Sequence, residues 1–511
     1  MVDELRATPP AAIMQGYDTF SASGRATAVT GDTSTINAHG RCDYTVCTST
    51  QSLNSALDIS ASISAEFGFG GGDAKSEYVR NLATTSTSVV IAIYASVVTG
   101  TAVVTNPRLK DGVKPPDAAG LDSFFQGYGD SYISSLTHGG EYIATYTFYS
   151  QTRTEQQKVV AALQAHGVAG TGTVSGGVDV AVSQVGSSEQ VRVSFSQQLF
   201  GFSGVALPSQ DQMVTFALGL SARTPGTPTV VAYETEGYEH VPGMDPRVWD
   251  SLLDARDLFL DHTLGAGVAG AVQAVDAMAS QTAWLRRVYA AYGYTLDADF
   301  GPRARAVEGD ATALRAFIRK LQRDPTRSYT LPALPSLEYG LPVLNVTTPV
   351  LAQQWGGSGG AAFWDVNMQT VLDAAPVRQV AMWASNIAAR RIDTTYGHAP
   401  AISHGGTGGD TGSPLQPLVL EPGEFISAMS GRWGTTLDYL TLTTTRDQKR
   451  EGGGPGGGPY SWTVPPPAGA KYTVVVGFGG RSGWDLDALG PMTSTFSPAT
   501  WQGPSSLEAA G

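Results

Sequence analysis

The sequence predicts an α+β protein that ends in an all-β part, and three stretches of different character carry this prediction. Residues 18–240 are rich in Ser, Thr, Gly and Val, with the period-2 alternation of apolar and polar residues that is typical of strands. Residues 245–325 place apolar residues at helical spacing. Residues 350–491 return to short strands separated by glycine turns. A chain of 511 residues is expected to form about two to four domains.

The composition is poor in charge and rich in glycine. Charged residues make up 15% of the chain and glycine accounts for 61 of its 511 residues, which favours many short strands and turns over a coiled coil or charge-driven disorder. Lys and Arg number 32 against 45 Asp and Glu, a formal net charge of −13, and no basic run occurs. Long-range electrostatics therefore attracts the chain neither to nucleic acid nor to an anionic lipid surface.

Strict alternation marks part of the first stretch. Every odd position from Leu57 to Phe69 is apolar and every even position is polar or Gly, and this segment exceeds the ~9–11 residues that a tilted strand needs to cross a bilayer. Val178–Ser183 and Val191–Ser196 alternate as well. We predict either sheet strands with one face on a core or strands that face lipid after insertion. The candidate lipid-facing residues are Leu57, Ile59, Ile63, Phe67, Phe69, Val178, Val180 and Val182.

Three helices are predicted in the middle stretch. Pro246 opens the first, in which apolar residues recur up to Phe259, and the others cover Ala283–Tyr289 and Ala311–Leu321. In the last stretch, the run Gly452–Pro459 is predicted to be a flexible insert. A linker before the last stretch is marked by Pro332, Pro335 and Pro342.

No metal, cofactor or catalytic group is expected. Cys42 and Cys47 are either two ordinary thiols or one local bridge, and Cys-x4-Cys alone is poor zinc spacing. The seven histidines are scattered, without a His-Glu-x-x-His motif. Gly356–Gly360 satisfies the pattern Gly-x-Ser-x-Gly, but a nucleophile elbow needs a strand, a turn and a helix, and no helix is expected after Ser358. We therefore do not expect an enzyme.

The sequence contains no segment that would predict export or a membrane-spanning helix. The opening residues, Met-Val-Asp-Glu-Leu-Arg, lack the basic and apolar regions of a signal peptide. The most apolar long stretch, Leu264–Met278, contains Gln273 and Asp276 and is too short to span a bilayer as a helix. The chain is expected to be made in soluble form.

A motif in the first stretch resembles the signature of the membrane attack complex/perforin (MACPF) superfamily. The segment Tyr-Gly-Asp-Ser-Tyr at 128–132 is followed, after six residues, by Gly-Gly. The signature reads aromatic-Gly-Thr/Ser-His-aromatic, six residues, Gly-Gly. Asp130 and Ser131 depart from it, so a role that depends on the family's His cannot be transferred. The residues that fit are Tyr128, Gly129, Tyr132, Gly139 and Gly140.

This resemblance implies a bent central antiparallel sheet with flanking helical clusters. Gly139-Gly140 would then be a hinge, because glycine supplies backbone freedom at low steric cost; the alternative is a plain turn. The resemblance places two hairpin-forming clusters near residues 48–82 and 151–188. In the soluble protein such clusters are packed helices, which implies a helix over Gln151–Ala165, and insertion converts them to amphipathic hairpins that close a barrel without edges.

The last stretch resembles a jacalin-related lectin, a β-prism of three Greek-key sheets. The similar segments are Trp355–Asp365, Leu418–Gly434 and Val476–Gly490. In that family the sugar lies between the first glycine-rich loop and a Gly-x-x-x-Asp loop, here Gly483–Asp487. The alternative is a prism that keeps the fold without binding sugar. The implied carbohydrate-binding residues are Gly360, Gly483, Trp484, Asp485 and Asp487, with backbone N–H groups of Trp484 and Asp485 on one hydroxyl, Asp487 on two more and Trp484 as an apolar platform.

Together these features predict residues 1–345 as a MACPF-like pore-forming domain with a helical appendage at 245–325, residues 346–492 as a β-prism and residues 493–511 as a tail. Resemblance to bacterial insecticidal MACPF toxins implies an insecticidal pore-forming toxin, released from a bacterial cell. It would bind a glycan, a glycosylated receptor or lipid on the target-cell membrane, assemble into a ring-shaped homo-oligomer and insert hairpins. The alternative is a lectin or adhesin whose MACPF-like domain does not insert.

Overall fold

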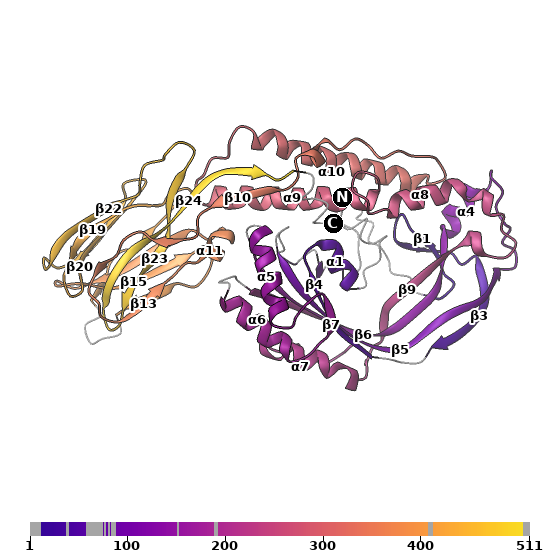
Figure 1. The fold of residues 1–511 in the computed structure, drawn as a ribbon, viewed down its shortest axis with the longest axis horizontal. Coiled ribbons are helices and arrows are strands. Elements are labelled where there is room, and N and C mark those ends of the chain that lie inside the picture. The colour runs from indigo at the N-terminus through magenta and orange to yellow at the C-terminus, as the bar shows by residue number, and fades with distance from the viewer. Residues whose placement is uncertain are drawn as a thin grey trace. The chain divides into compact units, whose positions relative to one another are not determined.

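The computed structural model describes residues 12–36, 40–57, 75, 78–79, 82, 88–150, 153–188, 193–406 and 412–503. The chain divides into two compact units (Figure 1). The first comprises Met1–Gln281, Arg303–Leu341 and Trp501–Gly511, and the second comprises Thr282–Pro302 and Pro342–Thr500.

A nine-stranded sheet forms the centre of the first unit, and it is built around two long antiparallel neighbours. β5 (Val89–Leu109) and β6 (Ser131–Phe148) pair from Val89↔Phe148 to Val103↔Ser135. Strands of this length require many alternating or β-branched residues, which both segments have. The other described strands are β1 (Gly16–Asp18), β2 (Ser23–Arg25), β3 (Val29–Ile36), β4 (Gly40–Cys47), β7 (Thr171–Thr173), β8 (Val193–Phe200) and β9 (Thr229–Gly237).

Each long strand changes its outer partner near its middle. β4 pairs with the first half of β5 and β3 with the second half, and the change falls between Val97 and Thr101. β9 pairs with the first half of β6 and β8 with the second half, and the change falls between Gly139 and Glu141. Figure 1 shows β3 and β9 beside one half of the long strands and β4 and β7 beside the other.

Two inserts cover opposite faces of one half of this sheet. The insert between β4 and β5 contains α1 (Thr50–Ala56), whose buried Leu53 packs with Val90 and Tyr94 of β5. The insert between β6 and β8 contains α5 (Arg153–Ala165) and α6 (Gly177–Ser188), which pack against the face that carries Ile91 and Ile93. Even and odd positions of a strand point to opposite faces, so the described helices of the two inserts lie on opposite faces of the sheet.

The structure of the inserts contradicts part of the prediction of strands from alternating apolar and polar residues. The helix expected over Gln151–Ala165 is present as α5, and Val193–Ser196 of the segment expected to alternate lies in β8. Val178–Ser183, predicted as a strand from its alternation, lies instead in α6. Leu57 is the C-terminal cap of α1 and no strand begins at it. Residues 58–74 lie outside the described part of the chain.

A helical part completes the first unit, which includes one long helix only up to Gln281 and another only from Arg303 onwards. α4 (Leu121–Tyr128), α8 (Asp250–Leu260), α9 (Val268–Ala291) and α10 (Phe300–Arg323) contribute to a core that includes Phe20, Trp249 and Phe259. α9 and α10 contain the two short helices predicted at Ala283–Tyr289 and Ala311–Leu321 but extend beyond them at both ends. The small residues of α9 hid its first half, because alanine-rich turns give weak apolar periodicity. A short helix, α7 (Met213–Leu218), lies between β8 and β9.

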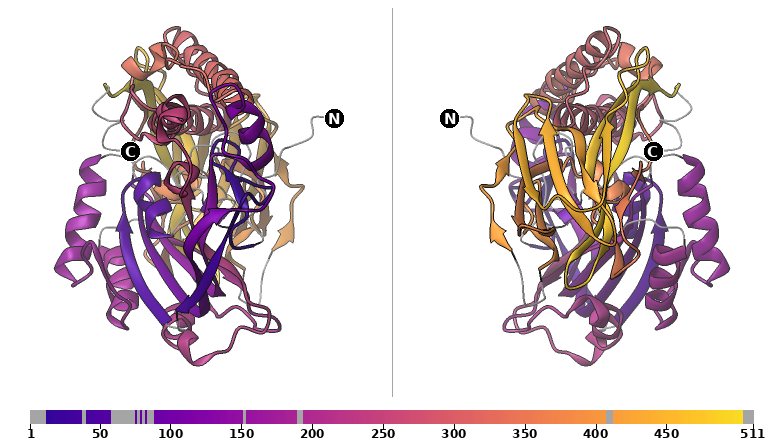
Figure 2. Two further views of the ribbon diagram at one scale, coloured as in Figure 1. Left: turned by 90° about the vertical axis from the view of Figure 1, so that its right-hand side faces the viewer. Right: turned by 90° about the vertical axis from the view of Figure 1, so that its left-hand side faces the viewer.

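The second unit contains three antiparallel sheets, whose strands face the viewer in the right panel of Figure 2. The first comprises β10 (Pro342–Val346), β11 (Val350–Leu351), β12 (Trp355–Gly356), β13 (Ala361–Trp364), β23 (Tyr472–Ser482) and β24 (Leu486–Trp501). The second comprises β14 (Val377–Ala384), β15 (Ala389–Tyr396), β16 (Ile402–Gly405), β17 (Ser413–Pro414) and β18 (Leu418–Val419). The third comprises β19 (Ile426–Trp433), β20 (Leu437–Thr444), β21 (Lys449–Gly453) and β22 (Gly458–Thr463).

Two expectations for this unit change. β24 continues past residue 493, where a tail was predicted to begin, and ends at Trp501. The extension is held by pairs such as Tyr472↔Phe496, and the Phe496 ring stacks on Tyr292 with centroids 5.2 Å apart. The run Gly452–Pro459, predicted as a flexible insert, joins β21 to β22 and forms part of both strands.

The two cysteines are free thiols in β4. Burial raises the pKa of Cys42 to about 11, with the Asp43 charge contributing, and burial raises that of Cys47 to about 12. Among the described residues, no cluster of three His, Cys, Asp or Glu is arranged to hold a metal ion. In those same ranges no helix combines the length and apolar character needed to cross a bilayer.

Candidate functional site

The structure brings together the residues predicted to bind carbohydrate. The first glycine-rich loop joins β12 to β13, and β13 pairs with the end of β23 through Ala361↔Ser482. Gly360 has a φ of +60°, and a Cβ at this position would lie 2.5 Å from Oδ2 of Asp487. Only glycine therefore lets this loop approach the carboxylate. Gly483 is the other wall, since a Cβ on it would lie 3.3 Å from Cα of Gly360.

An arginine that the motif does not include holds the glycine loop in place. Nε and Nη2 of Arg481 donate to the carbonyl oxygens of Gly359 (2.9 Å) and Gly360 (2.7 Å). The backbone N–H of Gly357 donates to the carbonyl of Asp487 at 2.9 Å. A planar guanidinium that bonds two successive carbonyls fixes the loop more firmly than a single donor would. Arg481 lies just before the Gly-x-x-x-Asp motif, and this position in the sequence is the signal that could have identified it as a site residue.

Asp487 supplies the acceptor of this site. Burial raises the pKa of its carboxyl group, and the charge of Asp485 adds to that effect. The backbone N–H of Gly483 and the charge of Arg481 act in the opposite direction. A carboxylate held beside backbone donors accepts hydrogen bonds from neighbouring hydroxyls, which is the chemistry that a pyranose ring offers.

Asp485 and Trp484 have different positions in the same turn. The Trp484 side chain is 78% exposed, so its indole is available as an apolar platform. The Asp485 carboxylate accepts a hydrogen bond from Nη1 of Arg390 at 2.7 Å, and Nε of Arg390 donates to Oγ of Ser385. The side chain of Asp485 therefore anchors the turn, which is compatible with the role predicted for its backbone N–H. Arg390 lies far from this turn in the sequence, and no motif pointed to it.

Ser358 does not lie in a nucleophile elbow. The segment that follows it is β13, a strand, where the elbow requires a helix. His404, one of the two downstream histidines, has Nε2 2.6 Å from Oδ1 of Asp365 and stacks on Phe363. Asp365 directly follows β13 and His404 lies in β16, so this contact joins two of the three sheets.

The signature-like segment lies where α4 meets β6. Tyr128 ends α4, and Gly129 has a φ of +82°, with a Cβ there only 2.0 Å from the carbonyl oxygen of Tyr17. Tyr132 is buried in β6, and its hydroxyl donates to Oε2 of Glu236 at 2.6 Å. Burial and that carboxylate raise the pKa of Tyr132.

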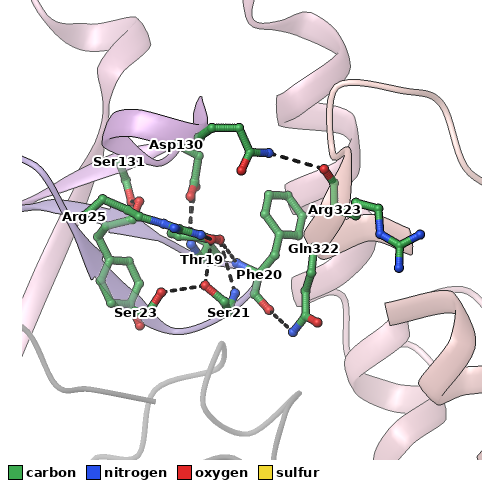
Figure 3. A network of polar contacts seen from close by, with 12 residues as sticks. Thr19, Phe20, Ser21, Ser23, Arg25, Asp130, Ser131, Gln322 and Arg323 are labelled. Atoms are coloured by element: carbon green, nitrogen blue, oxygen red, sulfur yellow. Dashed lines mark hydrogen bonds and ion pairs between the residues drawn. The ribbon is translucent and has the colours of Figure 1, made fainter. Parts of the chain in front are cut away.

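Asp130, one of the two residues that depart from the signature, belongs to a buried polar network (Figure 3). The N–H and Oγ1 of Thr19 both donate to its carboxylate at 2.7 Å. Burial raises the pKa of Asp130 to about 6, with the charge of Asp18 in the same direction and Thr19 and Arg256 opposing. The network continues through Arg25, which donates to Asp18 at 2.5 Å. These contacts fix the start of β6 to β1.

Gly139 and Gly140 lie inside β6, where the outer partner changes from β9 to β8, so the plain-turn alternative is wrong. A Cβ on Gly139 would lie 2.2 Å from the carbonyl oxygen of Val97 on the neighbouring strand. A Cβ on Gly140 would lie 2.3 Å from the ring of Phe202. Both glycines are therefore needed for close approach at this point of the sheet.

The candidate lipid-facing residues are only partly described. Leu57 is buried at the C-terminal end of α1, and Val178 and Val182 are buried against the sheet from α6. Val180, on the same helix, is 55% exposed. Ile59, Ile63, Phe67 and Phe69 lie outside the described residues.

Comparison with known proteins assigns part of the second unit to a family. Residues 352–492 match the family model of the Jacalin-like lectin domain. The jacalin-related lectin Calsepa of Calystegia sepium is 27% identical over 152 residues, which are 28% of this chain and 95% of that lectin. Among solved structures, a Malaysian banana lectin variant is 28% identical, with 28% of this chain and 96% of that one covered and a TM-score of 0.23. The mannose-binding lectin from champedak is 21% identical, with 29% and 97% covered and a TM-score of 0.24.

The family match includes both loops of the candidate site and strands of all three sheets, and it leaves out β10, β11 and the end of β24. The matched segment begins at residue 352 and ends at residue 492, inside β24. Residues 352–492 of this chain are a jacalin-like lectin domain.

Proposed function

We propose that this protein is a glycan-directed pore-forming toxin, in which the lectin domain binds the target surface and the first unit assembles into a ring and inserts two hairpins. One observation carries the proposal. Both inserts leave the sheet at the same end of four adjacent strands, because Cys47 pairs with Val90, Val89 with Phe148, and Phe148 with Val193.

Because of this alignment, both inserts would extend from the same end of the sheet. If each insert became extended, it would continue two neighbouring strands as one hairpin, and the two hairpins would lie side by side. Neighbouring copies of such a pair would close a barrel in which all backbone groups are bonded, the only form in which strands persist in lipid. The MACPF-like signature supports the same reading, since its Gly139-Gly140 pair lies at the change of partner strands.

The chemistry of the second insert is compatible with two environments. In α6, Val178 and Val182 face the sheet and Val180 faces outward. In an extended strand all three would share one face, with Asp179 and Ser183 on the other. A segment that is soluble as a helix and amphipathic as a strand needs this weak, alternating hydrophobicity.

The test compares Val180→Lys with Ser183→Lys. Both positions are exposed on α6, so both variants should fold and remain soluble. On an inserted strand, the lysine of the first variant would face lipid at a cost of ~2–4 kcal/mol per chain near the midplane, whereas the lysine of the second would face the aqueous lumen. We expect loss of dye release from midgut brush-border vesicles for the first variant and near-normal release for the second. Equal release by both variants would refute the proposed lipid face.

The second candidate is a lectin or adhesin whose first unit does not insert. The observation that favours it is that the family match covers the lectin domain and stops there. Vesicle binding without dye release and without rings in negative stain, repeated after acid and protease treatment, would establish this candidate. Release together with rings would exclude it.

A further inference from the structure

A second hairpin of the lectin domain repeats the pattern of the candidate site. Residues 432–438 read Arg-Trp-Gly-Thr-Thr-Leu-Asp and residues 481–487 read Arg-Ser-Gly-Trp-Asp-Leu-Asp, with Arg, Gly, Leu and Asp at matching places. β19 and β20 are joined with the same spacing as β23 and β24. Each hairpin has a register shift immediately after its arginine. The two turns are therefore equivalent parts of a repeated unit.

A second glycine loop accompanies this hairpin. The Gly-Gly-Pro-Gly-Gly loop that ends at Gly457 joins β21 to β22, as the Gly-Gly-Ser-Gly-Gly loop that ends at Gly360 joins β12 to β13. Gly457 has a φ of +59°, and a Cβ on it would lie 2.3 Å from Oδ2 of Asp438. The corresponding values for Gly360 and Asp487 are +60° and 2.5 Å. Each loop therefore approaches its carboxylate in the same way.

The hydrogen bonds that hold the loop are repeated as well. Nε and Nη2 of Arg432 donate to the carbonyl oxygens of Gly456 (2.8 Å) and Gly457 (2.7 Å), as Arg481 does in the first site. The N–H of Gly454 donates to the carbonyl oxygen of Asp438 at 2.8 Å. Matching partners, atoms and distances mean that the backbone cradle of the first site is built a second time.

The remaining hairpin, between β14 and β15, keeps the fold without the chemistry. A Cβ on Gly405 would lie 2.3 Å from the carbonyl oxygen of Arg390, as one on Gly453 would lie 2.1 Å from that of Asp438. Arg390 thus occupies the place of the acceptor aspartate. Trp383, which pairs with Arg391, occupies the place of the clamping arginine. The fold therefore does not require the arginine and the aspartate that the other two hairpins share.

The two complete hairpins meet at one end of the domain. A Cβ on Gly357, in the first glycine loop, would lie 1.9 Å from the carbonyl oxygen of Thr435, in the second hairpin. Near Asp438, the Trp433 side chain is 39% exposed and Gly456 and Gly457 are exposed. The second cradle is therefore open to solvent beside the first.

We propose that the lectin domain has a second saccharide site, formed by Gly457 and the turn from Gly434 to Asp438. The Asp438 carboxylate accepts hydrogen bonds from two neighbouring hydroxyls of a pyranose, and backbone N–H groups of the turn donate to another. Thr436 Oγ1 lies 3.3 Å from Oδ1 of Asp438 and keeps the carboxylate oriented. This inference rests on the proposed glycan binding at Asp487. Two adjacent sites bind the arms of one branched glycan, which raises the avidity of each chain.

The number of sites in the full chain tests the proposal. Calorimetric titration with methyl α-mannoside, methyl α-glucoside and methyl α-galactoside should give two molecules bound per chain for the sugar that binds. Asp438→Asn and Asp487→Asn should each lower this number to one, and the double variant should bind none. Asp447→Asn is the matched control, because Asp447 is exposed in a turn with a φ of +61° that Asn tolerates.

Each result distinguishes the second site from the first. One molecule bound by the parent chain, lost in Asp487→Asn and kept in Asp438→Asn, would overturn the second site and leave the proposed glycan binding intact. No binding of any of the three sugars by the parent chain would overturn both. Circular dichroism of every variant should match that of the parent chain. If Asp438→Asn unfolds, Thr435→Trp is the test variant in its place, and it should change the affinity of one of the two sites.

Discussion

Nζ of Lys75 lies 2.8 Å from Oε1 of Glu141, and both side chains are buried. Lys75 also donates to the carbonyl oxygen of Val231, and the hydroxyl of Tyr94 donates to Glu141. Lys75 belongs to the first insert, and Glu141 follows the Gly139-Gly140 pair in β6. The ion pair therefore ties the insert to the sheet at the point where the outer strand changes.

Lys75→Met should destabilise the protein strongly, because it leaves the Glu141 carboxylate buried beside no ammonium group. Breaking a buried pair in this way costs about 3–5 kcal/mol. Urea unfolding followed by tryptophan fluorescence measures the change. Lys75→Met combined with Glu141→Gln should recover much of the loss, and a double variant as unstable as the single one would contradict this account.

Asp130→Asn should change how stability depends on pH. The folded pKa of about 6 lies above the usual value near 3.9, so folding favours the protonated form. The penalty for the charged form is present above pH 6, declines as the pH falls towards 4, and amounts to about 2–3 kcal/mol. Relative to the variant, the parent chain should gain stability over this range, as urea midpoints measured from pH 7 to pH 4 would show. A constant difference across that range would argue against a raised pKa.

Gly139→Ala and Gly140→Ala should differ in severity. The added methyl group meets backbone at Gly139 and a movable aromatic ring at Gly140. Backbone in a paired strand cannot move away cheaply, so we expect a loss of about 2–3 kcal/mol at Gly139 and about 1 kcal/mol at Gly140. Thermal unfolding of the two variants makes the comparison, and the reverse order would mean that Phe202 is the more rigid neighbour.

Arg481→Lys should weaken sugar binding at the first site. A lysine can replace one of the two hydrogen bonds to the glycine loop but lacks the planar fork that makes both. We expect about a tenfold loss of affinity, equivalent to about 1.4 kcal/mol, with the number of sites unchanged. Arg432→Lys is the matched variant for the second hairpin. Unaltered affinity in Arg481→Lys would show that the loop keeps its position without the guanidinium.

The sequence predicted the lectin fold and the approach of the glycine loop to the Gly-x-x-x-Asp turn, because both segments have a local geometry that their spacing reports. It did not predict Arg390 beside Asp485, since that contact joins residues from different hairpins. The run Gly452–Pro459 was interpreted as flexible because glycine content alone does not distinguish a mobile loop from one held by an arginine. Helix α6 was missed from its pattern because Val178, Val180 and Val182 alternate as a strand does, and packing against the sheet decided the outcome. The roles of Asp130 and Lys75 could not be predicted, because each depends on contacts with residues that lie far away in the sequence.

The placement of β5 and β6 along the chain also has a kinetic consequence. These two strands are joined by a short connection that contains α4, so they can pair with a small loss of loop-closure entropy. β4 must close a loop over the first insert, and β1 must close a far longer one, before either joins the sheet. The β5–β6 pair is therefore expected to form early in folding and the outer strands later. Substitutions in the inserts should then change the unfolding rate far more than the folding rate.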